Sequence, residues 1–169
     1  MTTKYTRFET PLGTMFAVAT DGEITRLDFT DAKYVAKLAD DAKEDRNDPA
    51  LARCARQVAE YFAGKRDAFD LPFAPQGTDF QKRIWREIAK VRFGKTITYS
   101  ELAKRAGAEG SARAAGAATG RNPIAVAIPC HRIVGADGSL TGYAGGLPRK
   151  TKLLELEGVL RGARQGALL

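Results

Sequence analysis

The first thirty positions alternate between apolar and polar residues, which is the period of two that a half-buried β-strand requires. Strands are expected from Tyr5 to Thr10 and from Met15 to Thr20. An Asp-Gly pair at 21–22 then gives a strong signal for a tight hairpin turn, and apolar positions continue over 24–29. The pattern predicts a small antiparallel meander.

From Leu51 to Phe62, the apolar positions follow the period of a helix instead of the alternation of a strand. Apolar side chains recur there every three or four residues, and they stop before Gly64. Cys54 lies on this apolar stripe, so its thiol is expected to be buried and unreactive.

Three further helices are predicted in the second half from their start signals. Residues 78–81 (Thr-Asp-Phe-Gln) form a capping-box pattern, and a helix over 79–90 follows. A second capping box at 98–101 opens a short helix that Gly107 ends, and another helix runs over 111–119. Two short helices joined by a glycine-containing turn make a helix-turn-helix candidate.

The helix over 111–119 has an unusual composition. It holds almost nothing but alanine and glycine, apart from the long cationic side chain of Arg113. Small residues let a backbone come close to another surface, and a DNA groove is one such surface. Tight packing against a neighbouring helix, with Arg113 in solvent, explains the composition equally well.

The end of the chain supplies the most reactive candidate. The apolar run 124–128 is predicted to be a buried strand that delivers Cys130 on a rigid support. A glycine-rich loop follows over 141–146, and a final helix over 147–157 is closed by Gly158. The predicted fold class is therefore α+β with two domains. A small N-terminal α/β domain with an antiparallel sheet precedes a mostly helical domain with the helix-turn-helix and a short active-site strand.

The domain boundary is placed in residues 70–77, which hold two prolines and a glycine. Residues 1–75 carry 11 Lys and Arg against 13 Asp and Glu, whereas residues 76–169 carry 16 against 7. The net charge of +7 thus belongs to the C-terminal domain. A polyanion is the expected partner, nucleic acid ahead of an anionic membrane surface.

Composition excludes several protein classes. With 44% hydrophobic and 28% charged residues, the 169-residue chain is neither fibrous, disordered nor a disulfide scaffold. It has no apolar run of about 18 to 20 residues and no signal-peptide pattern at its start, so a cytoplasmic location without membrane contact is expected. Cys54 and Cys130 are expected to stay unpaired, and with His131 as the one histidine we expect no metal site.

The chemistry available at Cys130 depends on its neighbours. A thiol attacks as the thiolate, so it needs a base or a positive charge nearby. His131 and Arg132 follow directly, but adjacent side chains on an extended backbone point to opposite sides. A bridging water or a turn is then required, and the Pro-Cys-His-Arg string alone is more often structural than catalytic.

Several segments of the second half carry a specific pattern. They are FGKTITYSELA at 93–103, RAAG at 113–116, NPIAVAIPCHRIV at 122–134, GYAGGL at 142–147 and LLELEG at 153–158. In these motifs and their spacing, the chain from about 78 to 158 resembles the O6-alkylguanine-DNA alkyltransferases. Residues 1–75 resemble the N-terminal domain of that family only in length and coarse pattern.

The resemblance implies direct-reversal repair of double-stranded DNA that contains O6-alkylguanine. The damaged base is flipped out, and its alkyl group moves irreversibly to the protein's own cysteine. By position in the motifs, Cys130 is the acceptor and Tyr99 protonates the departing guanine. His131, acting through a water and oriented by Glu157, is the base that generates the thiolate.

The resemblance also assigns the DNA-binding and pocket residues. Arg113 enters the base stack in place of the flipped base, from a small-residue helix that lies in the minor groove. The other DNA-binding positions are Ala112, Ala114, Gly116 and Ala117. The residues of the substrate pocket are Tyr143, Ala144, Ile133 and Asn122, and Asn122 also holds the turn before the active-site strand.

Further expectations follow from the resemblance and from charge. The protein acts once, needs no cofactor, and is a monomer. Glu109 stands where the family often has proline, and Ala144 where it often has serine, which should leave room for alkyl groups larger than methyl. Arg149, Lys150 and Lys152 are expected to contact DNA phosphates.

Three other functions fit parts of the pattern. An alkyltransferase-like recognition protein would lack the acceptor cysteine, which is present here. A transcriptional regulator of this family would carry an additional Cys-rich domain in front. A cysteine hydrolase would turn over esters or amides, but nothing in the chain resembles a hydrolase oxyanion motif.

Overall fold

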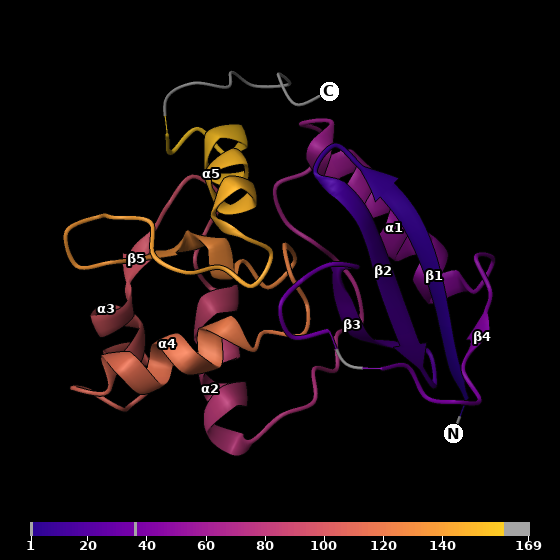
Figure 1. Ribbon diagram of the computed structural model, residues 1–169, viewed down its shortest axis with the longest axis horizontal. Coiled ribbons are helices and arrows are strands. Elements are labelled where there is room, and N and C mark those ends of the chain that lie inside the picture. Colours follow the sequence, from indigo (N-terminus) through magenta and orange to yellow (C-terminus); the bar gives the residue numbers. More distant parts are fainter. Residues whose placement is uncertain (1, 36, 161–169) are drawn as a thin grey trace.

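The computed structural model describes residues 2–35 and 37–160, and its two parts are visible in Figure 1. A sheet with one helix forms the N-terminal part, and the remaining helices form the C-terminal part. Residues 161–169, the end of the predicted C-terminal domain, lie outside the described residues.

The predicted meander is confirmed. The strands of the sheet are β1 (Thr3–Thr10), β2 (Gly13–Thr20), β3 (Glu23–Phe29) and β4 (Lys43–Glu44), in the order β3-β2-β1-β4. The first three pair antiparallel, and positive φ values at Asp21 and Gly22 form the tight turn between β2 and β3. The two-residue β4 pairs parallel to β1, so the sheet is mixed. That strand is too short to leave a pattern in the sequence.

Helix α1 (Pro49–Phe62) packs on β1 and β2. It begins two residues before the predicted Leu51, because the Asp48 side chain accepts hydrogen bonds from two backbone N–H groups of the first turn. Cys54 is fully buried between helix and sheet, and burial raises the pKa of its thiol to about 12. The prediction of an unreactive, buried Cys54 agrees with both observations.

Every helix predicted in the second half is present to within two residues at each end. These helices are α2 (Asp79–Ala89), α3 (Tyr99–Arg105), α4 (Ala112–Gly120) and α5 (Leu147–Leu156). The capping box of α2 is complete, since Thr78 and Gln81 each bond the other's backbone. The Thr98 hydroxyl caps α3, and the turn between α3 and α4 contains Gly107.

The prediction of a strand over residues 124–128 is wrong. Prolines flank the run on both sides, and the Asn122 side chain donates to the carbonyls of Ile124 and Ile128 while accepting from the Ile124 N–H. The segment is therefore a compact set of turns, with Val126 at a φ of 70°. A 3-10 turn, η1 (Cys130–Arg132), and the short strand β6 (Ile133–Val134) follow it.

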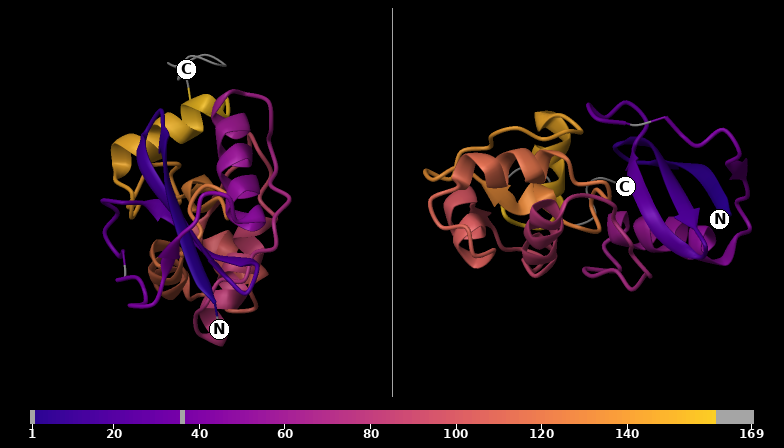
Figure 2. Two further views of the ribbon diagram at one scale, coloured as in Figure 1. Left: turned by 90° about the vertical axis from the view of Figure 1, so that its right-hand side faces the viewer. Right: turned by 90° about the horizontal axis from the view of Figure 1, so that it is seen from below.

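The N-terminal sheet lies directly against the segment that leads to Cys130. The Leu27 N–H of β3 donates to the Pro123 carbonyl at 2.9 Å, and the Ala125 N–H donates back to the Leu27 carbonyl at 2.7 Å. The right-hand view of Figure 2 shows the two parts side by side. Within the described residues, no helix is long and apolar enough to cross a membrane.

Candidate active site around Cys130

Strand pairing brings the cysteine and a tyrosine together. Strand β5 (Ile97–Thr98) runs parallel to β6, with Ile97 opposite Ile133. Tyr99 follows β5 and Cys130 lies three residues before β6, so both side chains reach the same place. They line a cavity of about 390 Å³, to which α4, the loop 142–144 and the N-terminal part also contribute.

The Cys130 thiol is protonated in the resting site. Burial raises its pKa to about 11, a hydrogen bond with Asn122 lowers it, and the charges of Asp28 and Lys150 raise and lower it respectively. Only 8% of the residue is exposed. Since the thiolate is the nucleophile, a base must remove this proton before the sulfur can react.

A buried carboxylate joins the two residues that follow the cysteine. His131 Nε2 lies 2.7 Å from Glu157 Oε2, and Arg132 donates through Nε and Nη2 to the same carboxylate at 2.7 and 2.9 Å. The sequence argument about the directions of the Cys130 and His131 side chains assumed an extended backbone, whereas residues 130–132 form a 3-10 turn. From this turn, His131 and Arg132 both reach Glu157.

The contact with Glu157 determines the tautomer of a neutral His131 imidazole. Because Glu157 accepts from Nε2, the lone pair of the neutral imidazole lies on Nδ1. His131 Nδ1 is buried and has no hydrogen-bond partner among the described residues. Burial raises the pKa of Glu157, but the interactions with His131 and Arg132 outweigh burial and lower this pKa to about 2. The site thus pairs a permanent carboxylate with an imidazole whose free nitrogen can accept a proton.

The N-terminal part contributes a hydrogen bond that the sequence did not predict. The Tyr61 hydroxyl, on α1, donates to Glu157 Oε2 at 2.5 Å. Tyr61 lies 96 positions away and belongs to an apolar helical stripe, so its spacing indicated only a core residue. Glu157 therefore ties α1 to the segment that carries the cysteine.

Two tyrosines have different surroundings in the cavity. Burial raises the pKa of Tyr99, and its side chain bonds to Thr141, so Tyr99 is a protonated donor at neutral pH. The Tyr99 ring lies against α4: a Cβ atom added at Gly116 would lie 3.6 Å from the ring. The Tyr143 hydroxyl is buried without a partner among the described residues. A bound molecule could supply that missing partner.

The expectation that Lys150 contacts DNA phosphates is wrong. The side chain is fully buried, and Nζ donates to the carbonyls of Ile133, Thr141 and Gly142 at 2.6, 2.8 and 3.3 Å. Burial lowers the pKa of Lys150 to about 8. Lys150 therefore holds the loop over the cavity and places a positive charge near Cys130. The neighbouring Arg149 bonds to Asp31 and to the Leu12 carbonyl.

The structure of helix α4 is compatible with both interpretations of its composition, which are tight packing against a neighbour and close approach to DNA. Ala115, Ala118 and Thr119 are buried, so one face packs through small residues, and the Trp85 indole donates to the Ala118 carbonyl. Arg113, Ala114 and Ala117 are exposed on the opposite face, with Ala112 and Gly116 half-buried beside them. The positions predicted to bind DNA thus form a smooth, accessible strip with one cation.

The predicted pocket residues divide into two pairs. Tyr143 and Ala144 line the cavity, whereas Ile133 and Asn122 are buried beside it and are not among its lining residues. Asn122 holds the turns before Cys130, as expected. Ile133 contributes its carbonyl to Lys150 rather than to the cavity. Six further lining residues were not predicted as site residues, and they are Lys33, Tyr34, Thr119, Gly120, Arg121 and Gly142.

Metal ligands are not clustered. Across the part of the chain that the structure describes, no group of three or more His, Cys, Asp or Glu side chains could hold a metal ion.

Comparison with known families defines the class of protein first. Residues 79–159 match the model of the 6-O-methylguanine DNA methyltransferase DNA binding domain. Residues 3–75 match the ribonuclease-like domain of the same proteins. The class is thus that of the 6-O-methylguanine DNA methyltransferases, and their two domains agree with the predicted two-domain α+β fold.

Individual relatives agree with this class. A methylated-DNA–protein-cysteine methyltransferase from Methanosarcina barkeri is 43% identical over 153 residues, covering 90% of this chain and 96% of the relative. Another from Mycolicibacterium paratuberculosis is 40% identical over 154 residues, covering 91% and 92%. The crystal structure of Mycobacterium tuberculosis OGT in complex with DNA superposes with a TM-score of 0.83 at 38% identity, covering 91% and 92%. The chain belongs to the 6-O-methylguanine DNA methyltransferase family.

Proposed function

We propose that this protein repairs DNA by direct reversal: it transfers an alkyl group from O6 of guanine in double-stranded DNA to its own Cys130, once per molecule. The observation that carries the proposal is the Cys130 thiol in a cavity, followed directly by an imidazole whose Nε2 is held by Glu157. Family membership supplies the reaction class, and this arrangement supplies the nucleophile and its base.

The first step is removal of the thiol proton. With a pKa near 11, the Cys130 thiol reacts only if a base accepts its proton. His131 Nδ1 is the free acceptor, and we assign the transfer to a bridging water between sulfur and imidazole. The imidazolium that forms is stabilised by Glu157, which stays ionised at any pH near neutrality.

The second step moves the alkyl group. The Cys130 sulfur forms a bond to the alkyl carbon as the bond from that carbon to O6 breaks, and the electron pair of the broken bond stays on the guanine. Tyr99 donates a proton to this leaving group, because an unprotonated anion in a water-poor cavity is costly. Tyr99 then recovers a proton from His131. The net reaction moves one alkyl group to sulfur and one proton from sulfur to guanine.

The thioether product explains why each protein molecule reacts only once. A dialkyl sulfide has no good leaving group, so nothing in the site restores the thiol. We therefore expect repair to be stoichiometric in protein, without a cofactor.

Helix α4 is the proposed DNA-binding element. Guanine O6 cannot reach a buried sulfur while the base is stacked, so the damaged nucleotide must be flipped into the cavity. The strip of Ala112, Ala114, Gly116 and Ala117 allows close approach to the minor groove, and Arg113 fills the vacated place in the stack. Tyr143 and Ala144 line the pocket for the base.

The setting of this activity is proposed from the same features. We place the protein in the cytoplasm as a monomer, with residues 1–75 as a supporting domain and 76–169 as the domain that binds DNA and carries the cysteine. The contact of Tyr61 with Glu157 is the most direct support that the N-terminal domain gives to the site.

A repair titration tests the proposal. A duplex with one O6-methylguanine is mixed with limiting protein, and restored guanine is counted. Repair should stop when one guanine has been restored per protein molecule, and Cys130→Ala should restore none. Repair that continues through several turnovers, or that survives in Cys130→Ala, contradicts the proposed reaction.

A further inference from the structure

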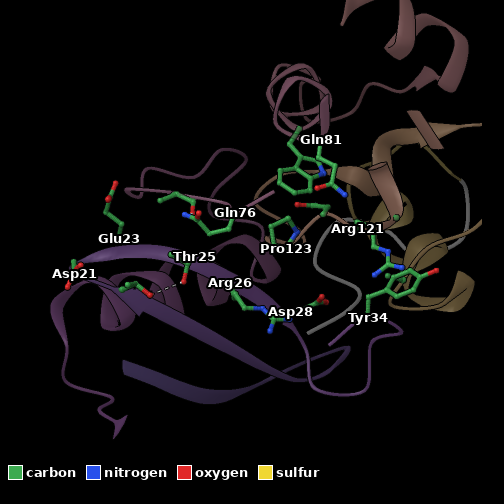
Figure 3. A pocket seen from close by; sticks show the side chains of 16 residues that line it. Asp21, Glu23, Thr25, Arg26, Asp28, Tyr34, Gln76, Gln81, Arg121 and Pro123 are labelled. Atoms are coloured by element: carbon green, nitrogen blue, oxygen red, sulfur yellow. Dashed lines mark hydrogen bonds between the residues drawn. The ribbon is translucent and has the colours of Figure 1, made fainter. Parts of the chain in front are cut away.

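A second, larger cavity adjoins the one that contains Cys130. It is a groove of about 730 Å³ between β3 and the C-terminal part. Figure 3 shows Asp21 and Glu23 at one end of this groove, with Tyr34 and Arg121 at the other. The residues that line both cavities are Tyr34, Gly120, Arg121 and Ala144. The two spaces are therefore separated by a partition of four residues.

The partition is made of side chains that can move or that leave space. The Arg121 guanidinium lies over the Tyr34 ring at 3.7 Å, and Tyr34 is 41% exposed on the loop after β3. An exposed cation–π pair of this kind is weak, so it can open at small cost. Ala144 and Gly120 present no long side chain. Below the partition, the Lys33 N–H donates to the Ala144 carbonyl and fixes the backbone.

The size of the reactive cavity limits what it can hold. About 390 Å³ lies near the lower end of the range for small-molecule sites, and the flipped base itself must occupy much of it. A methyl group on O6 adds little volume. A long substituent needs additional space, and the space on the other side of the partition is the groove.

We propose that this groove is a subsite for the distal part of long, flexible O6 substituents, with Tyr34 and Arg121 as the gate through which the chain passes. The inference rests on the proposed function and extends it to a substrate class. The bonds that form and break are those of methyl transfer. The substituent moves intact to the Cys130 sulfur, and its far end stays in the groove.

The lining of the groove indicates the chemistry of that far end. Its wall from β3 carries Thr25, Arg26 and Asp28, and the opposite wall carries Gln76 and Gln81. These side chains offer both donors and acceptors along the groove. A chain that ends in a hydrogen-bonding group therefore fits better than a purely apolar chain, because an apolar end displaces water from these side chains without replacing the hydrogen bonds of that water.

The experiment compares two lesions in the same duplex, O6-methylguanine and O6-(8-hydroxyoctyl)guanine, by single-turnover transfer to the full-length protein. Thr25 lines the groove but not the reactive cavity, so Thr25→Trp narrows only the subsite. Thr3→Trp, on β1 outside both cavities, is the matched control. Gln76→Trp narrows the groove from the exposed linker and serves if the strand variant does not fold.

The expected result is transfer of both groups by the natural protein. Thr25→Trp or Gln76→Trp should slow the hydroxyoctyl transfer by about tenfold or more and leave methyl transfer unchanged, and Thr3→Trp should affect neither. The subsite is refuted if methyl is transferred but hydroxyoctyl is not, or if the groove variants slow both lesions equally or neither. Absence of methyl transfer in the natural protein would instead contradict the proposed function.

Discussion

Removing the Tyr61 hydroxyl tests how the N-terminal part supports the site. Tyr61→Phe deletes one oxygen and leaves the ring, which packs against Phe62, Phe69 and Phe93. Both Tyr61 and Glu157 are almost completely buried, at 1% and 4% exposed. The lost hydrogen bond to the carboxylate is 2.5 Å long, and no water is expected to replace it in so closed a place.

The magnitude follows from the bond type. A hydrogen bond to a charged group contributes about 1.5 to 3 kcal/mol. Glu157 keeps the contacts with His131 and Arg132, so its charge is not left unpaired and the cost should be about 2 kcal/mol. For a chain of 169 residues, that corresponds to a fall in Tm of about 4 to 8 °C.

Urea unfolding followed by Trp85 fluorescence measures this free energy. Tyr5→Phe is the control, because the Tyr5 side chain stacks with Arg7 and shows no hydroxyl hydrogen bond among the described residues. In a double-mutant cycle, Tyr61→Phe should cost much less when Glu157 is already glutamine. A cost below about 0.5 kcal/mol, or one that is unchanged in the cycle, would refute the reasoning.

Three further predictions concern charge and DNA. The pKa of Glu157 is about 2 in the folded protein, against an ordinary value of 4.5. The free energy of unfolding should therefore fall by about 3 kcal/mol as the pH drops from about 4.5 to about 2. Urea titrations should show that Glu157→Gln lacks this part of the acid dependence. Lys150→Met removes a positive charge that lowers the pKa of Cys130. Alkylation of Cys130 by iodoacetamide should therefore become slower by several-fold at pH 7, where Lys150, with a pKa of about 8, is still mostly protonated; an unchanged rate would exclude that electrostatic role. Arg113→Ala should slow methyl transfer from duplex DNA by about tenfold or more and leave benzyl transfer from free O6-benzylguanine unchanged. An equal loss of transfer rate on both substrates would contradict the proposed insertion of Arg113 into the base stack.

Local signals in the sequence determined most of the helices and strands. The Thr78 capping box, the Asp21-Gly22 turn and the glycine at 158 act over two to four residues, so the sequence shows them directly. The run at 124–128 was misassigned because a short buried apolar segment looks the same as a strand or as packed turns. Its conformation depends on the bonds that Asn122 makes to backbone carbonyls up to six residues away.

Motifs indicated the candidate reactive residues, but not their contacts with the N-terminal part. Cys130, His131 and Glu157 stand in recognisable segments; in the structure Cys130 lines the cavity, and the residue that follows it, His131, bonds to Glu157. Tyr61 and Tyr34 reach the site from the N-terminal part, and only the packing of the two parts determines those contacts. Lys150 was misassigned because a lysine near a helix start usually faces solvent, whereas this buried lysine donates to the carbonyls of Ile133, Thr141 and Gly142.

The mass of the intact protein after reaction tests the central claim most directly. The protein is incubated with a duplex carrying one O6-methylguanine, and its mass and its peptides are then measured, with Cys130→Ala as the control. We predict a gain of one methyl group per molecule, located on the peptide that contains Cys130 and absent in the control. An unchanged mass despite tight binding of the lesion would contradict the account and leave Cys130 as a structural thiol in a recognition protein.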